Sequence, residues 1–106
     1  EGTLKETSYL NLFYAEFWED TMDEYRSTVR NNPDENSYLF YNDHMDMFVS
    51  EYAAYNPEED IAESFCTFVL EDQPTGNRIK DQKVAFFYQF EELVEIRNTM
   101  RANIMK

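Results

Sequence analysis

The chain has 106 residues, with 9 Lys and Arg against 22 Asp and Glu, so its formal net charge is −13. This length suits one small domain, and the acidity disfavours nucleic acid or an anionic membrane as a partner, because both need a basic face. One Cys and one His exclude an internal disulfide and any zinc site that needs two imidazoles from this chain alone.

Apolar runs are short, as in Val84–Tyr88, so we expect no membrane-spanning segment. The chain opens with Glu1-Gly2-Thr3, which has neither an initiator Met nor a signal-peptide pattern. We therefore expect a fragment or a processed product of a longer protein.

The first helix is predicted from about Ser8 to Val29, with Thr7 or Ser8 as its N-cap and Asn31-Asn32-Pro33 as its end. Its apolar residues recur at spacings of three and four, which is the pattern of an amphipathic helix. These residues are Leu10, Phe13, Tyr14, Phe17, Trp18, Met22, Tyr25 and Val29.

The stretch from 34 to 56 is less regular. We expect a short helix around Glu35–Tyr41, a turn at Asn42-Asp43-His44 and an extended segment at Phe48-Val49-Ser50. A clear helix start follows, with Asn56 as N-cap and Pro57 at the first position, and this helix should end near Glu71. Its apolar stripe comprises Ile61, Phe65, Phe68 and Val69.

Two more helices are predicted after the Pro74–Asn77 turn. The first covers about Arg78–Tyr88, with Ile79, Phe86, Phe87 and Phe90 on one side. The second covers about Glu91–Ile104, with Leu93, Ile96, Met100 and Ile104 facing inward. The whole pattern predicts an all-α bundle of four to five helices, forming a single domain over residues 1–106.

Every Lys and Arg lies outside residues 31–77, a window that holds eleven acids. Such a cluster is usually a solvated face, but here Glu59 and Glu63 share one helix face with Cys66 and Leu70. Carboxylates next to the core need a cation, a metal or several hydrogen-bond donors. The alternative is that both reach water at the edge of the core, or pair with Arg78 or Lys80.

The segment Tyr52–Phe65 resembles the third-ligand segment of zinc metallopeptidases of the anthrax lethal factor type. These are His-Glu-x-x-His enzymes whose third zinc ligand is a Glu on a later helix. Their pattern has a Tyr, then the ligand Glu seven residues on, then a second Glu four further, preceded by Ala and soon followed by an aromatic. The matching residues are Tyr52, Glu59, Ala62, Glu63 and Phe65.

Two other stretches are similar to secreted bacterial members of this group, so the resemblance covers most of the chain. They are Glu6–Tyr9 with the aromatics Phe13, Tyr14, Phe17 and Trp18, and Pro74–Asn77 with Gln82, Lys83 and Phe86–Tyr88. The resemblance implies the C-terminal subdomain of a zincin-like (gluzincin) fold, in an extracellular or cell-surface protein.

The resemblance also implies a role for each matched site residue. Glu59 would be the third zinc ligand, and Glu63 would orient a ligand His through its other ring nitrogen. Tyr52 would stabilise the oxyanion or protonate the leaving amine. Zinc would polarise the substrate carbonyl and activate the attacking water.

The chain departs from the family by lacking the His-Glu-x-x-His helix, since His44 is its only His. We therefore expect the C-terminal half of a metallopeptidase domain, with the upstream half and a peptide or protein substrate as partners. Zinc is expected in the full-length parent, whereas this chain alone should be inactive and bind little or none.

Two other interpretations remain open. One is a non-catalytic acidic interaction module, in which Tyr52, Glu59 and Glu63 need not converge. The other is a pseudo-peptidase that has lost its catalytic helix. We expect His44 to be a surface residue and Cys66 to be inert packing near the core. Aromatic residues left uncovered in a half-domain could also drive self-association.

Overall fold

The computed structural model describes residues 2–28 and 33–104, and within them it has six α-helices, three short 3₁₀-helices and no strand. The α-helices are α1 (Gly2–Phe17), α2 (Met22–Thr28), α3 (Pro33–Asp43), α4 (Pro57–Leu70), α5 (Ile79–Phe86) and α6 (Glu91–Ile104). The 3₁₀-helices are η1 (Met45–Met47), η2 (Tyr52–Tyr55) and η3 (Phe87–Gln89). The all-α prediction is thus confirmed, with six helices instead of four or five.

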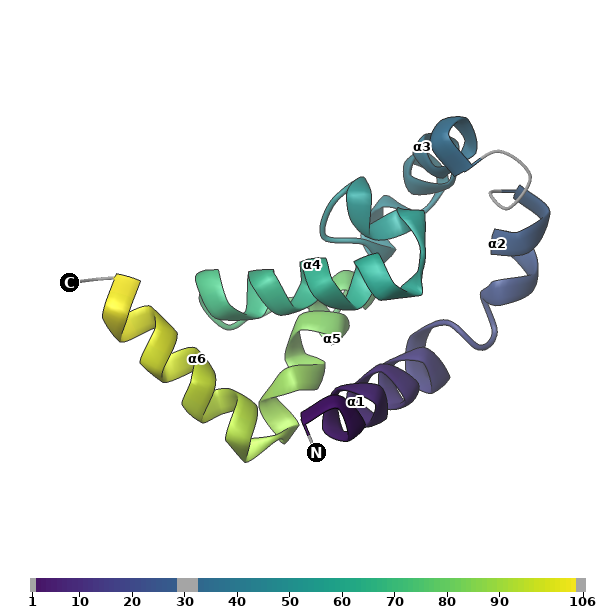
Figure 1. Cartoon of the computed structure of the whole chain (residues 1–106). Helices are drawn as coiled ribbons and strands as arrows, with labels where there is room; N and C mark the ends of the chain where they lie inside the picture. Colours follow the sequence, from purple (N-terminus) through teal and green to yellow (C-terminus); the bar gives the residue numbers. More distant parts are fainter. Residues whose placement is uncertain (1, 29–32, 105–106) are drawn as a thin grey trace.

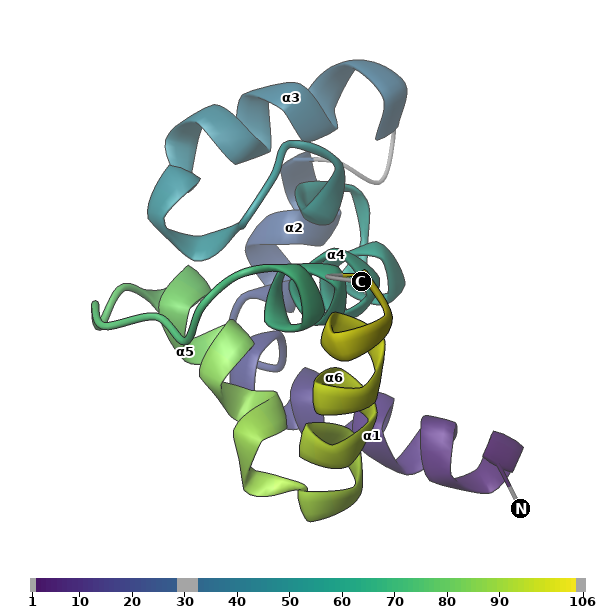
Figure 2. The same ribbon diagram turned by 90° about the vertical axis from the view of Figure 1, so that its left-hand side faces the viewer.

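Helix α4 lies at the centre of the molecule, with α3 on one side of it and α1, α5 and α6 on the other (Figures 1 and 2). The core between these helices is mainly aromatic. Its fully or almost fully buried rings are Phe13, Trp18, Phe40, Phe48, Phe68 and Phe87. Within the described residues, no helix combines the length and apolar character needed to cross a membrane.

The single helix predicted over Ser8–Val29 is wrong, because α1 begins at Gly2 and ends at Phe17 before α2 starts at Met22. The interruption brings the rings of Trp18 and Tyr25 to 5.1 Å between centroids, nearly at right angles. In an unbroken helix these positions would lie about 10 Å apart along the axis. Packing Trp18 into the core therefore outweighs continuing the helix. The predicted end at Asn31-Asn32 lies outside the described residues.

The irregular middle of the chain follows the prediction in part. Helix α3 extends past the expected Glu35–Tyr41 on both sides, so the turn comes only at His44. Of the extended segment expected at Phe48-Val49-Ser50, Phe48 is extended, with φ −131° and ψ 135°, but the chain bends at Val49 and Ser50. The 3₁₀-helix η2 was not predicted.

Helix α4 begins as predicted, since Asn56 Oδ1 accepts a hydrogen bond from the Glu59 amide at 2.7 Å. Its other end is capped by side chains of α6. Arg97 Nε donates to the Phe68 carbonyl at 2.7 Å, and Arg101 Nη1 donates to the Val69 carbonyl at 3.1 Å. Carbonyls at a helix C-terminus lack helical partners and favour nearby cations, so these two arginines hold α6 across the end of α4.

The predicted inward face of 91–104 is wrong beyond Leu93. Leu93 is buried, but the side chains of Ile96, Met100 and Ile104 are exposed. The reason is that α6 turns Leu93 and its two capping arginines toward α4, which leaves the neighbouring face uncovered. Ile79 is also exposed, contrary to prediction, because α5 begins there after the Arg78 cap.

Candidate functional site

Tyr52, Glu59 and Glu63 come together on one face of the molecule. The Tyr52 phenol lies close to the Glu59 carboxylate. Interaction with Glu59, and more weakly the charge of Glu63, raises the pKa of the Tyr52 phenol. The Tyr52 side chain is 59% exposed, so the phenol remains accessible from solvent. The three residues therefore converge, as the peptidase interpretation requires.

The start of α4 determines where the two glutamates lie. With Asn56 as N-cap and the buried Pro57 at the first position, Glu59 falls in the first turn and Glu63 one turn later. Both glutamates are half-buried and lie on the same side of the helix. The spacing in the sequence predicted this shared face correctly.

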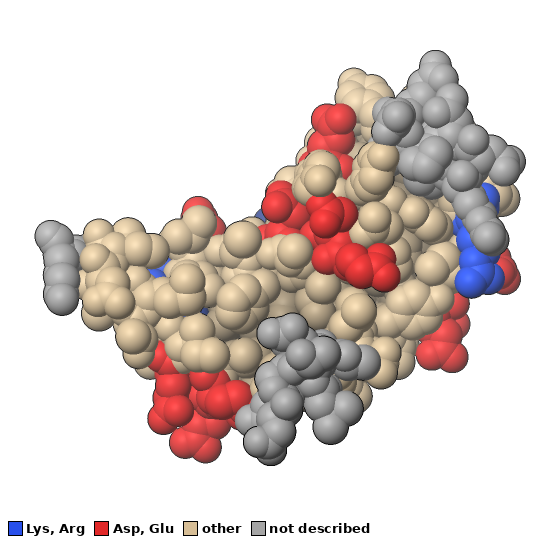
Figure 3. Space-filling view, in the orientation of Figure 1, with Lys and Arg blue, Asp and Glu red and all other residues tan. Residues whose placement is uncertain are grey.

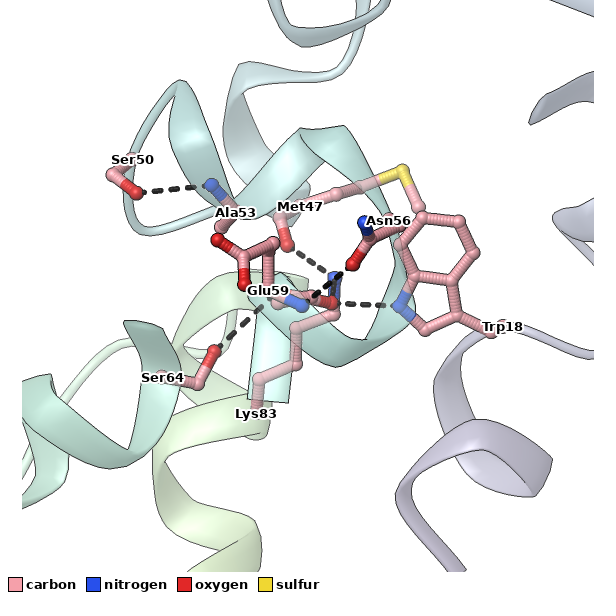
Figure 4. Close-up of polar contacts among 9 residues, drawn as sticks. Trp18, Met47, Ser50, Ala53, Asn56, Glu59, Ser64 and Lys83 are labelled. Carbon is pink, nitrogen blue, oxygen red and sulfur yellow. Dashed lines mark hydrogen bonds and ion pairs between the residues drawn. The ribbon is translucent and has the colours of Figure 1, made fainter. Parts of the chain in front are cut away.

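The turn that carries Tyr52 is held by Ser50 (Figure 4). The Ser50 hydroxyl accepts a hydrogen bond from the Ala53 amide at 3.1 Å and donates one to Glu63 Oε1 at 2.8 Å. Ala53 and Ala54 are fully buried in η2, which leaves Tyr52 on the outer side of the turn. Sequence reasoning missed this part of the site. The sequence offered one signal for it: Ser50 stands directly before this turn, and serine side chains often bond to nearby backbone groups.

Behind the glutamates lies a buried ion pair. Lys83 Nζ is 2.7 Å from Asp60 Oδ2, and both side chains are completely buried. Trp18 Nε1 donates to the same carboxylate at 2.8 Å and Ser64 Oγ at 3.4 Å, so Trp18, Ser64 and Lys83 converge on one group (Figure 4). Burial raises the pKa of Asp60 and lowers that of Lys83, while their attraction opposes both shifts.

The ammonium of Lys83 has two further contacts. It donates to the Met47 carbonyl at 2.6 Å and lies 4.1 Å from the centroid of the Phe48 ring. The network therefore ties the turn after α1, η1 and α5 to the first turns of α4. It was not predicted, although Lys83 directly before the apolar run Val84–Tyr88 and an Asp four residues before Ser64 were visible in the sequence.

Among the described residues, no cation neutralises the carboxylates of Glu59 and Glu63. Within the described chain, no ion pair joins either of them to a Lys or Arg, and Arg78 instead pairs with Asp81 at 2.9 Å. Figure 3 shows acidic side chains gathered over η2 and the N-terminal part of α4. The exposed Glu51 directly precedes η2, and the exposed Glu58 lies in the first turn of α4. This face is therefore open to a cationic group.

Two other residues differ from their predicted surroundings or contacts. Cys66 is exposed on the outer side of α4, so the expected packing near the core is wrong. His44 is only partly exposed, and its Nε2 lies 2.9 Å from Glu24 Oε2. Its ring packs on Phe40. The partners of His44 are thus in α2 and α3, not at the glutamates.

An apolar groove of about 730 Å³ runs beside the glutamates, between α1, α4 and α6. Its walls include Leu10, Ile61, Phe65 and Ile96, and Ala62, which lies between Glu59 and Glu63 in the sequence. At its edge Tyr9 donates a hydrogen bond to Glu92, which raises the pKa of Tyr9 to about 12.

Metal ligands are incomplete within residues 2–28 and 33–104, where no three His, Cys, Asp or Glu side chains are arranged to hold an ion. Glu59 offers one oxygen ligand and Glu63 one supporting carboxylate. Comparison with protein-family models, curated proteins and solved structures finds no match.

Proposed function

We propose that this chain is the C-terminal part of a zinc-dependent metallopeptidase domain of the anthrax lethal factor type. In this proposal Glu59 is the third metal ligand, Glu63 orients a ligand His, and Tyr52 acts on the substrate. The observation that carries the proposal is the convergence of Tyr52, Glu59 and Glu63 on one accessible face. The spacing of these three residues in the sequence does not by itself require their side chains to lie on one face.

The surroundings of Glu59 suit a ligand. Its backbone is fixed by the Asn56 cap, and its carboxylate has no competing Lys or Arg among the described residues. A half-buried carboxylate that lies against a phenol, with no cation beside it among the described residues, can take up a metal ligand role. A bound zinc ion would supply Lewis-acid activation of the substrate carbonyl and of water.

Tyr52 is suited to donate a hydrogen bond. A phenol is protonated at neutral pH even at its ordinary pKa of about 10, and the pKa of Tyr52 is raised further by Glu59. A protonated phenol stabilises negative charge developing on a peptide carbonyl oxygen. The hydroxyl already lies against Glu59, so a substrate carbonyl held near that residue would be within its reach.

The partners of the chain follow from the same proposal. The two imidazoles and the general-base Glu belong to an upstream half of the domain, and the substrate is a peptide or protein. The exposed Ile96, Met100 and Ile104 support a missing neighbour, because folded proteins rarely expose contiguous apolar faces. Self-association through these residues is the corresponding proposal for the isolated chain. An extracellular or cell-surface location belongs to the proposal as well.

The second candidate is a non-catalytic acidic interaction module or a pseudo-peptidase. The uncompensated acidic face over η2 and α4 favours it, since such a face attracts a basic partner without any metal (Figure 3).

Zinc titration by calorimetry separates the two candidates. It is run on this chain and on the protein extended by the residues encoded upstream, each as wild type, Glu59→Ala and Glu58→Ala. Glu58 is the matched control, an exposed acid on the same helical turn. Stoichiometric binding only in the extended protein, lost in Glu59→Ala and kept in Glu58→Ala, supports the peptidase. No binding in either wild-type protein leaves the second candidate.

A further inference from the structure

The apolar groove is the start of a longer apolar surface on α4 and α6. Its walls include Ala62 of α4 and Ile96 of α6. From each of these residues an exposed row continues at a spacing of four, which keeps side chains on one side of a helix. The rows are Ala62, Cys66 and Leu70 on α4, and Ile96, Met100 and Ile104 on α6. We call the groove and these two rows the α4–α6 surface.

The α4–α6 surface is elongated. Arg97 and Arg101 bond to carbonyls in the last turn of α4, so the C-terminal parts of both helices lie next to each other (Figure 1). The row from Ile96 to Ile104 covers about 12 Å of helix, and the groove adds a hollow of about 730 Å³ at its start. This shape suits a linear ligand with several apolar side chains better than a small compact molecule.

The walls of the groove indicate which kind of linear ligand fits. The described residues form no strand, so this part of the chain has no sheet edge to which an extended peptide could add. A groove between helices takes an amphipathic helix, whose apolar residues at positions i, i+3 or i+4 and i+7 enter it. The α4–α6 surface therefore fits a helix with one apolar face.

Charge around the groove narrows the choice further. Glu92 stands in the groove wall and Glu95 follows it on α6, and both are exposed. Figure 3 shows acidic side chains over the start of α6 as well as over η2 and the start of α4. No Lys or Arg is among the described residues that line the groove. Charge complementarity therefore requires basic residues on the occupant.

A second copy of the chain meets only part of this requirement. It could cover the apolar rows, but it brings the same net charge of −13. The arginines of α6 are already bonded to carbonyls of α4. Two acidic surfaces repel each other at close approach, so a basic helix should bind more tightly than a second copy.

We infer that the α4–α6 surface docks an amphipathic helix of a partner protein that carries Lys or Arg beside its apolar face. The inference goes beyond the proposed function, because it needs neither zinc nor the residues assigned to the peptidase site. It also gives the exposed Ile96, Met100 and Ile104 a partner of definite chemistry.

The test measures binding of a synthetic helix to the chain by fluorescence anisotropy. The peptide is about 15 residues long, with Leu on one face and Lys beside it. Its controls are a scrambled sequence and a version with Glu in place of Lys. We expect micromolar binding that weakens as salt is added, and much weaker binding of both controls. Equal binding of the scrambled peptide would mean that charge alone acts, and would overturn the inference.

Variants in an apolar row locate the binding. Ile96→Ser should weaken it by about 10-fold, as expected for an anchor position. Leu39→Ser is the matched control, because Leu39 is similarly exposed but lies on α3. Both side chains are exposed, so neither change should unfold the chain. Equal affinities of the two variants would overturn the inference.

A second pair of variants tests the charges. Glu92→Gln/Glu95→Gln should weaken binding and reduce its dependence on salt. Asp43→Asn/Asp46→Asn removes the same charge from exposed positions in α3 and η1 and should stay close to wild type. If the two double variants bound the peptide equally, the acids of α6 would have no specific part in docking, contrary to the inference.

The protein extended by the residues encoded upstream separates the possible occupants. If it binds the peptide as the chain does, the α4–α6 surface is open to a partner protein, as inferred. If only the chain alone binds it, the upstream part covers this surface and the inference is wrong, while zinc titration still decides the proposed function. A dimer of the chain that the peptide fails to dissociate in sedimentation would also overturn the inference.

Discussion

Lys83 Nζ lies 2.7 Å from Asp60 Oδ2, with both side chains fully buried, so the one completely buried carboxylate of the described chain is neutralised by a residue 23 positions later. Glu59, its neighbour in α4, has no Lys or Arg partner in the part of the chain that the structure describes. The two adjacent acids therefore have opposite roles: Asp60 anchors the helix to the core, and Glu59 remains available to a ligand.

Replacing Lys83 with Met should destabilise the fold by about 3–5 kcal/mol, because it leaves an uncompensated buried charge. Urea unfolding at pH 7 measures this. The control Lys80→Met removes a lysine from the same helix that makes no ion pair among the described residues, and it should change stability by less than about 0.5 kcal/mol. The double variant Asp60→Asn/Lys83→Met should recover part of the loss. Equal stabilities of Lys83→Met and Lys80→Met would contradict the structural role of the pair.

The pH dependence of Lys83→Met follows from the same pair. Burial raises the pKa of Asp60. A carboxyl whose pKa is raised on folding contributes stability below its unfolded pKa, about 3.9, and loses that contribution as the pH rises through the folded pKa. The deficit of Lys83→Met relative to wild type should therefore shrink on acidification. If the stability loss of Lys83→Met stayed constant from pH 7 to pH 4, the result would argue against a raised pKa of Asp60.

Asp81 should give the opposite dependence. Hydrogen bonds from Arg78 hold its pKa below the ordinary value, and it caps the start of α5. Its contribution is present above the unfolded pKa and is lost as the pH falls through the lower folded pKa. Asp81→Asn should cost about 1 kcal/mol at pH 7 and approach wild type as the pH falls through the lowered pKa of Asp81. Asp72→Asn, in an exposed pair with Arg101, is the control and should change little.

Arg97 is expected to stabilise the end of α4. Arg97→Met removes its bonds to the Phe68 and Glu71 carbonyls and should cost about 1–3 kcal/mol. Thermal unfolding gives the loss, and hydrogen exchange should quicken in the last turn of α4. Arg26→Met, an exposed arginine in α2, is the control and should be near neutral. Matching effects of the two variants would show that the α6 cap contributes nothing specific.

The contact between Tyr52 and Glu59 can be tested by titration. Interaction with Glu59 raises the pKa of the Tyr52 phenol. Glu59→Gln should therefore lower that pKa toward the usual value of about 10, whereas Glu58→Gln should leave it nearly unchanged. NMR of the labelled tyrosine rings resolves Tyr52 from the other tyrosines. An unchanged Tyr52 titration in Glu59→Gln would place the phenol away from Glu59 in solution.

Local chemistry determined much of what the sequence alone predicted. The all-α class, the start of α4 at Asn56-Pro57 and the bounds of α6 at Glu91–Ile104 agree with the structure. Each depends on interactions between residues a few positions apart, namely caps, helical hydrogen bonds and the helical periodicity. The shared face of Glu59 and Glu63 was predicted in the same way, because the two residues are only four positions apart in one helix.

Packing between distant residues decided the rest. The break between α1 and α2 places Trp18 in the core, where it meets Asp60 of α4. The same tertiary contacts pair Asp60 with Lys83, turn the arginines of α6 onto the end of α4 and leave Ile96 exposed. Ser50 likewise joins the Tyr52 turn to α4. Local periodicity carries no information on which distant partner a side chain will meet, because that depends on how the helices pack once their apolar faces are buried.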